Sequence, residues 1–164
     1  MTSAEALTRF DALPAVNTHE MLGAWRGSGV PTGHDMDGLL EGYAWYGKSF
    51  VSEDVVHPLL FRNRAGETYA IDPRRIPLSL ARFSRLARSA GARALFAYGA
   101  PMLRSRAPRA RLRAVTHRGV TTAAMIYDHL PIIDYFRRID AHTMLGLMDM
   151  RGAAPFFFQL EQDA

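Results

Sequence analysis

The chain has 164 residues and no cysteine, and 48% of its residues are hydrophobic, 22% charged and 10% aromatic. This is the length of one domain and an ordinary globular composition, which excludes a disordered chain, a disulfide scaffold and a collagen-like chain. The lack of cysteine also excludes thiolate chemistry, iron–sulfur clusters and cysteine-type zinc sites.

The net charge is +4, yet among the 20 basic residues Lys48 is the single lysine and all the others are arginine. The excess of arginine over lysine reflects codon usage, or Lys48 has a role that a guanidinium cannot fill, since only an amine loses its proton near neutral pH. The arginine-rich stretches 82–93 and 104–113 contain one aromatic residue, Phe83, and no nucleic-acid motif. A solvated basic face is therefore expected, rather than a nucleic-acid footprint.

Three segments predict helices in chain order. Residues 2–12 form the first, residues 35–43 a second, short one, and residues 77–90 the clearest, with apolar residues at helical spacing and arginines pointing outward. Gly91 is expected to end this last helix.

The other segments predict strands, because they are short, rich in aromatic and β-branched residues, and separated by turn residues. They are residues 43–51, 55–62, 109–117, 120–128, 132–138, 143–150 and 155–161, after a first strand at the Gly-x-Trp near residue 25. Strands at this regular pace predict an antiparallel meander that closes into a single barrel over residues 1–164. The fold class is α+β, mainly β, with short N-terminal helices and one mid-chain helix.

Three strings place polar residues where a simple barrel needs apolar ones. They are Gly23-Ala24-Trp25-Arg26-Gly27 with Pro31-Thr32-Gly33-His34, then Trp45-Tyr46-Gly47-Lys48 with His57-Pro58, and lastly residues 127–136 with residues 145–149. At these strings the chain resembles a bacterial family that pairs a GXWXG domain with a C-terminal domain of unknown function. The resemblance covers about residues 20–63 and 109–161. The Gly-x-Trp start is also similar to lipocalins and nitrobindins, which implies one lipocalin-like β-barrel around a small-molecule cavity.

Lys48 belongs to one of these strings. Strict alternation along 43–51 places it on the same face as Tyr46 and Phe50, opposite Trp45. If this face lines the cavity, the amine is partly desolvated and becomes a candidate base or imine former. If it is the outer face, Lys48 is an ordinary surface charge.

Two further carboxylates are candidates for acid/base work. Asp149 lies on a strand with two largely apolar faces, so the strand is expected to be covered on both sides and Asp149 is either at its end or in a nonpolar setting. There it either pairs with Arg113 or Arg151 or acts as a general acid or base. Asp128 and Asp134 bracket a proline bend, where Asp128 either caps the bend or takes part in the chemistry.

Among the histidines, His34 and His57 lie in the family-like strings. Each is either a hydrogen-bonded structural residue or an acid/base group. The sequence has no histidine spacing typical of a metal site, so no metal is expected. No nucleotide-binding motif occurs either, and no cofactor is expected. The similarity to nitrobindins leaves haem as an alternative, with His117 or His129 as its axial ligand.

These features together predict a cofactor-independent acid/base enzyme, of isomerase, lyase/hydratase or cyclase type, for a small hydrophobic carbonyl-containing or conjugated molecule. The alternatives are a lipocalin-like carrier or sensor and a haem-binding protein. The candidate catalytic residues are Lys48, His57, Asp149, His34, Tyr46 and Asp128. The candidate ligand-binding residues are Trp25, Trp45, Phe61, Tyr127, Phe136 and Leu147.

We expect a small hydrophobic molecule as the partner, with no nucleic acid and no membrane, and a homodimer is left open. No long apolar stretch or signal-like N-terminus occurs, so a cytoplasmic location is expected.

Overall fold

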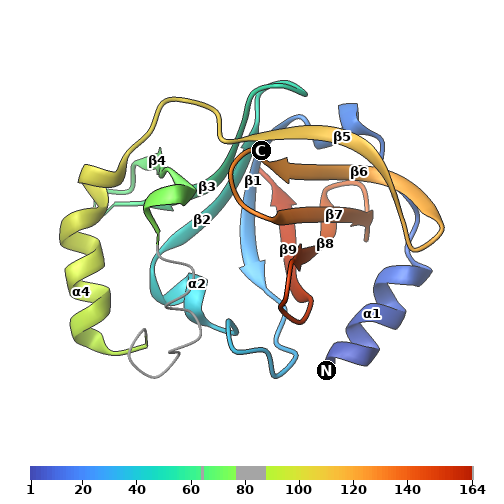
Figure 1. Cartoon of the computed structure of the whole chain (residues 1–164), viewed down its shortest axis with the longest axis horizontal. Helices are drawn as coiled ribbons and strands as arrows, with labels where there is room; N and C mark the ends of the chain where they lie inside the picture. Colours follow the sequence, from blue (N-terminus) through green and yellow to red (C-terminus); the bar gives the residue numbers. More distant parts are fainter. Residues whose placement is uncertain (64, 77–87, 164) are drawn as a thin grey trace.

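Eight of the nine strands close into an antiparallel barrel in the order β2-β1-β9-β8-β7-β6-β5-β3, with β3 pairing back to β2 and β4 lying beyond β3 (Figure 1). The computed structural model describes residues 1–63, 65–76 and 88–163. The strands are β1 Gly23–Gly29, β2 Trp45–Phe50, β3 Val56–Arg62, β4 Thr68–Ala70, β5 Ala110–His117, β6 Val120–Tyr127, β7 Ile132–Arg138, β8 Thr143–Met150 and β9 Phe156–Gln162. The expected barrel and the mainly β class are confirmed.

Helices lie at two sides of the barrel. At one side is α1 (Ser3–Ala12), which begins at a capping box between Thr2 and Glu5. At the other side are α2 (Leu39–Gly42) and α4 (Ala90–Gly99) (Figure 1). The 3-10 turns are η1 Thr18–Met21, η2 Pro73–Arg75 and η4 Ala100–Leu103. None of the helices in the described ranges is long and apolar enough to cross a membrane.

The helix expected over residues 2–12 is confirmed, while that over 35–43 shortens to the single turn of α2. Most of the helix expected over 77–90 lies outside the described residues. The expectation that Gly91 ends a helix is wrong, because Gly91 lies in the first turn of α4, which Ser89 caps by accepting from the Ala92 amide.

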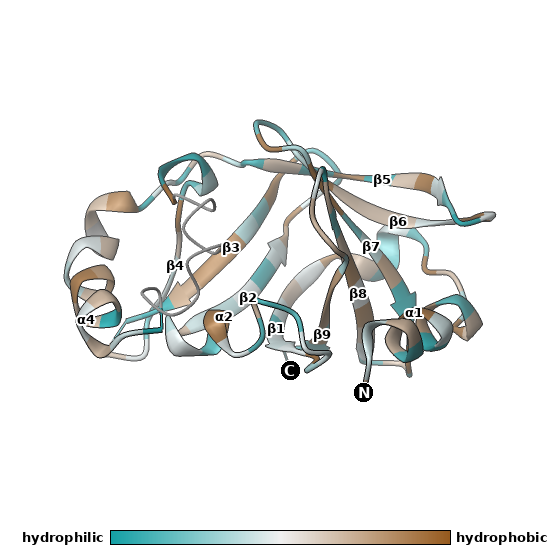
Figure 2. Ribbon diagram, turned by 60° about the horizontal axis from the view of Figure 1, so that its bottom comes forward, coloured by the Kyte–Doolittle hydropathy of each residue, from teal (hydrophilic) through white to brown (hydrophobic). Residues whose placement is uncertain are grey.

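Two apolar clusters stabilise the fold. The outer one lies where α1 covers β6 to β9, with Phe10 fully buried against Phe157 at a ring distance of 6.5 Å (Figure 2). The inner one fills the barrel and includes Trp25, which is fully buried and donates from Nε1 to the Met21 carbonyl at 2.8 Å. The Trp25 indole is therefore fixed within the barrel core.

Candidate functional site

A cavity of about 580 Å³ lies inside the barrel, beneath α2 and α4. Its walls are almost entirely apolar and come from β2, β3, β6, β7, β8 and β9 together with the two helices and the 3-10 turn η4. A volume of this size accommodates a small organic molecule. Among the residues that the structure describes, the charged side chains that line it are Lys48 and Asp134.

Lys48 reaches the cavity because β2 contains a bulge. The pairing of β2 with β3 shifts register on both sides of Gly47, so Trp45, Lys48 and Phe50 are buried while Tyr46 is only half-buried. The expected strict alternation, which placed Lys48 with Tyr46 and opposite Trp45, is therefore wrong. A Cβ on Gly47, whose φ is +153°, would lie 1.9 Å from the Trp25 carbonyl oxygen, so only glycine fits at the bulge.

Lys48 forms a buried ion pair across the barrel. Its Nζ lies 2.9 Å from Oδ2 of Asp134, and the two side chains are 4% and 1% exposed. The two residues come from β2 and β7, which are opposite each other in the strand order. Nζ also donates to the Pro58 carbonyl at 3.2 Å. An ammonium has three N–H donors, so one remains for a ligand.

Aromatic rings surround the ammonium. Nζ lies 4.9 Å from the ring centre of Phe158, 5.7 Å from that of Trp45 and 5.8 Å from that of Tyr127. These cation–π contacts stabilise a charge that is nearly shielded from water.

Glycines make room for two of these rings. A Cβ on Gly27 would lie 2.1 Å from the Trp45 indole, and a Cβ on Gly146 would lie 2.3 Å from the Phe158 ring. Gly27 is the last glycine of the Gly-x-Trp-x-Gly string, so this part of the motif shapes the cavity wall through the ring that it admits.

The electrostatics of the pair depend mainly on burial. Loss of hydration raises the pKa of Asp134, and the Lys48 charge only partly offsets this. The pKa of the Tyr127 phenol is raised well above its usual value by burial and by the nearby Asp134 charge, so Tyr127 stays neutral. A carboxylate with a raised pKa is a suitable proton acceptor and donor near neutral pH.

Three polar atoms at the cavity have unused hydrogen-bonding capacity. Both carboxylate oxygens of Asp134 and Nε1 of Trp45 are buried, and none of them makes a hydrogen bond to the residues that the structure describes, although Oδ2 faces Lys48 in the ion pair. Buried polar groups are normally paired, so these atoms point to a ligand with a polar end. They offer it carboxylate acceptors and one donor, besides the free Lys48 N–H.

The structure places Tyr46 and His57 outside the cavity. Both line a separate depression on the outer face of the barrel, with Asp163. The Tyr46 hydroxyl donates to Asp163 at 2.6 Å, which raises the pKa of the phenol. Partial burial lowers the pKa of His57. The two side chains share this depression, and neither faces the Lys48–Asp134 pair, because the bulge turns Tyr46 outward.

Asp128 and Asp149 do not enter the cavity either. Asp128 is exposed on the barrel surface and forms an ion pair of 3.0 Å with Arg111. Asp149 is exposed near the end of β8, which is the strand-end alternative, and it does not lie in a nonpolar setting. The apolar cover on its face comes from α1, which packs over Leu145 and Leu147.

His34 has a structural position beside the cavity. Its Nδ1 accepts from the Met36 amide at 3.0 Å and its Nε2 lies 3.2 Å from the Ala154 carbonyl, so its ring connects the loop before α2 to the loop before β9. Both ring nitrogens are therefore engaged with the backbone.

Of the expected ligand-binding residues, Trp45, Phe61 and Tyr127 line the cavity. Trp25 and Phe136 instead fill the packed core, and Leu147 lies in the outer cluster beneath α1. The two histidines considered for haem also lie elsewhere: His117 stacks on Tyr135 at 3.9 Å on the outer face, and His129 is exposed in the turn before β7.

The sequence reasoning did not select Asp134 for the site. The alternation of Ile132, Asp134 and Phe136 along β7 carries the signal, because a carboxylate between two inward apolar residues needs a buried partner. In the described ranges, no group of three or more histidine, cysteine, aspartate or glutamate side chains could hold a metal ion.

Two family models match the chain. One is described as GXWXG protein and matches residues 8–66, and the other is the domain of unknown function DUF4334, which matches residues 108–162. Lys48 lies in the first match and Asp134 in the second, so the ion pair joins the two matched segments within one barrel.

The fold is similar to a solved structure described as the crystal structure of a protein from Thermomonospora curvata. The TM-score is 0.73 and the sequence identity 33%, over 98% of this chain and 87% of that one. No match to a curated protein was found.

Proposed function

The chain belongs to the family of GXWXG proteins with a DUF4334 domain, and we propose that it is a cofactor-independent acid/base enzyme acting on a small hydrophobic carbonyl compound. The observation that carries the proposal is the Lys48–Asp134 ion pair, buried in the wall of an apolar cavity. Replacement of such a pair by apolar residues is often neutral or stabilising, so folding stability does not account for it.

The cavity favours a ligand with one polar end. Its lining is aliphatic and aromatic apart from the region around Lys48, Asp134, Tyr127 and Trp45. A carbonyl oxygen at this place would accept from the free Lys48 N–H, and the hydrocarbon part would fill the rest of the cavity.

The reaction that these two groups support best is a shift of a carbon–carbon double bond into conjugation with a carbonyl. Asp134 removes a proton from the carbon between the carbonyl and the double bond, and the electrons of that C–H bond form a dienolate. Lys48 stabilises the negative charge on the dienolate oxygen. Asp134 then returns the proton to the far carbon, so the product is an isomer of the substrate and no cofactor is consumed.

The test is a panel of hydrophobic β,γ-unsaturated ketones and aldehydes, with conjugation followed by ultraviolet absorbance. We expect Asp134→Asn to reduce kcat by about 10²- to 10⁴-fold, the usual contribution of a positioned base. The control is His57→Ala, which changes a histidine outside the cavity and should retain full activity. Isomerisation that is equally fast in Asp134→Asn would refute the assignment.

A carrier without turnover is the second candidate. The observation in its favour is that Lys48 and Asp134 neutralise each other, so the cavity has no net charge to attract an ionic ligand. The two candidates separate in one experiment, because a carrier would bind the same ketones tightly and return them unchanged.

A further inference from the structure

The helix α4 is apolar on all of its faces although none of its residues is buried. Its ten residues, Ala-Gly-Ala-Arg-Ala-Leu-Phe-Ala-Tyr-Gly, include one charged side chain, Arg93. A surface helix of a globular protein normally has a polar outer face. A helix that is apolar all round is normally covered on all sides, by protein or by lipid.

The two faces of α4 have different surroundings. Ala92, Phe96 and Gly99 border the cavity, and the Phe96 ring lies 4.9 Å from that of Tyr43 and 5.4 Å from that of Phe61. Exposed large apolar side chains also follow one another at helical spacing into η4, and two of them, Leu95 and Met102, reach the cavity as well. They are Leu95, Tyr98 and Met102, which are 73%, 86% and 79% exposed.

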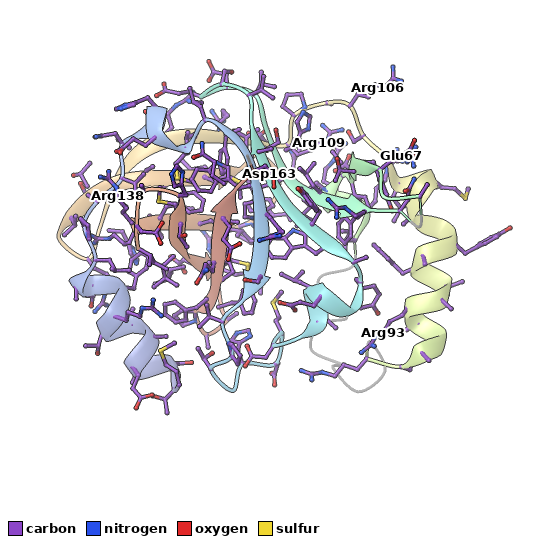
Figure 3. All side chains as sticks on the ribbon, turned by 180° about the vertical axis from the view of Figure 1, so that it is seen from behind. Glu67, Arg93, Arg106, Arg109, Arg138 and Asp163 are labelled. Carbon is purple, nitrogen blue, oxygen red and sulfur yellow. The ribbon has the colours of Figure 1, made fainter. Side chains whose placement is uncertain are left out.

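Positive charge surrounds this apolar face. Residues 73–127 include twelve arginines and no aspartate or glutamate. Arg93 and Arg106 lie near opposite ends of α4 in Figure 3. Glu67, of the β3–β4 turn, also lies near the Arg106 end, where its carboxylate accepts from Asn63 at 2.8 Å. The exposed arginines before, within and after α4 and η4 are Arg88, Arg93, Arg104 and Arg106.

We propose that the α4–η4 surface, formed by these three apolar residues and four arginines, docks onto an anionic lipid surface, contrary to the expectation from the sequence that no membrane is a partner. A lipid interface offers an apolar layer for Leu95, Tyr98 and Met102 and phosphate groups for the arginines, in the manner of an interfacial helix. A symmetric contact with a second copy would instead place arginines against arginines with no acidic residue of this segment to pair with them. A nucleic acid would match the charge but would leave the apolar side chains without a partner.

Docking through α4 would bring the lipid surface next to the cavity. The helix lies at one end of the molecule (Figure 2), and its Leu95 both borders the cavity and is exposed. A hydrophobic molecule dissolved in the lipid would therefore meet α4 directly on its way into the cavity. The inference goes beyond the proposed function, since docking needs neither Lys48 nor Asp134.

The experiment is flotation of the full chain with phosphatidylcholine vesicles, with and without phosphatidylglycerol. We expect binding to the anionic vesicles that weakens with salt. Leu95→Ser together with Tyr98→Ser should lower the partition coefficient at least tenfold, because two apolar side chains no longer enter the interface. Arg93→Gln together with Arg106→Gln should lower it about 25-fold, or about fivefold for each arginine.

Matched controls lie elsewhere on the surface. Val51→Ser changes an apolar residue that is 64% exposed in the β2–β3 turn, and Arg151→Gln changes an exposed arginine after β8. Both should leave vesicle binding unchanged, and circular dichroism confirms that every variant is folded. Lys48→Met should also bind vesicles as the unaltered chain does, which separates this inference from the proposed function.

Three results would overturn the docking surface. The first is no binding to anionic vesicles, and the second is binding that the α4 changes do not weaken. The third is a dimer, seen by sedimentation equilibrium, that dissociates when Leu95 and Tyr98 become serine, because a second copy would then cover the face.

Discussion

Replacing Lys48 with methionine leaves the Asp134 carboxylate buried without its counter-ion. The two side chains are 4% and 1% exposed and their charges lie 2.9 Å apart, so water cannot replace the lost partner. Breaking a buried ion pair from one side costs about 3–5 kcal/mol of unfolding free energy. In a chain of this length, that lowers the melting temperature by about 6–20 °C.

The double replacement Lys48→Met with Asp134→Leu should recover the unfolding free energy that Lys48→Met loses. Both charges are then absent and methionine and leucine fill a similar volume, so stability should equal or exceed that of the unaltered chain. Urea unfolding of the four proteins, followed by circular dichroism, gives the coupling free energy of the cycle. Arg26→Met is the control, since its pair with Glu161 is 63% and 43% exposed and its loss should leave stability nearly unchanged.

The pH dependence gives a second readout of the same pair. Burial raises the folded-state pKa of Asp134 above its unfolded value, so its contribution to stability is fully present below the unfolded pKa and declines as pH rises through the folded pKa. Without Lys48 this pKa rises further, so the destabilisation by Lys48→Met should be smallest in acid and grow toward neutral pH. If Lys48→Met and Asp134→Leu each cost less than about 0.5 kcal/mol of unfolding free energy and their effects are additive, the reasoning is refuted.

Three further predictions concern the cavity wall, an ion-pair cluster and ligand binding. Gly146→Ala places a methyl group 2.3 Å from a phenylalanine ring of β9 and should cost about 1–3 kcal/mol in urea unfolding, whereas Gly91→Ala has open space in α4 and should be neutral or stabilising. The Asp72 side chain is buried and pairs with Arg74 at 2.7 Å and Arg109 at 2.9 Å, and these contacts hold its pKa at about 2. Asp72→Asn should therefore cost about 2 kcal/mol of unfolding free energy at neutral pH, and this difference should vanish as pH falls through about 2. An unchanged difference in acid would contradict the assignment. An apolar ketone in the cavity should quench Trp45 fluorescence, so quenching should persist in Trp25→Phe and disappear in Trp45→Phe.

The barrel could be predicted from the sequence because each strand is short, rich in β-forming residues and bounded by turns. The strands from Ala110 to Gln162 follow this pattern closely. The face that each residue occupies was harder to predict in β2, since the bulge at Gly47 exchanges the places of Trp45 and Tyr46. A bulge depends on the neighbouring backbone of β1, which a strand pattern does not contain.

The site was partly predictable for a similar reason. Lys48 stands out because it is the single lysine, but its partner Asp134 lies across the barrel, and local spacing cannot pair residues on opposite strands. Asp149 shares a strand face with Leu145 and Leu147, and the sequence does not say whether the apolar residues of a strand face the barrel interior or an external helix. The helix α1 provides that external cover.

Exchange of carbonyl-adjacent protons with solvent deuterium tests the central claim most directly. A saturated hydrophobic ketone in D₂O, followed by proton NMR, reports proton removal by Asp134 even when no isomerisation can follow. The account predicts exchange that is catalysed by the unaltered chain, about 10²- to 10⁴-fold slower with Asp134→Asn, and unchanged with Asp149→Asn. Ketones that quench Trp45, and so occupy the cavity, but exchange no faster than in buffer would contradict it.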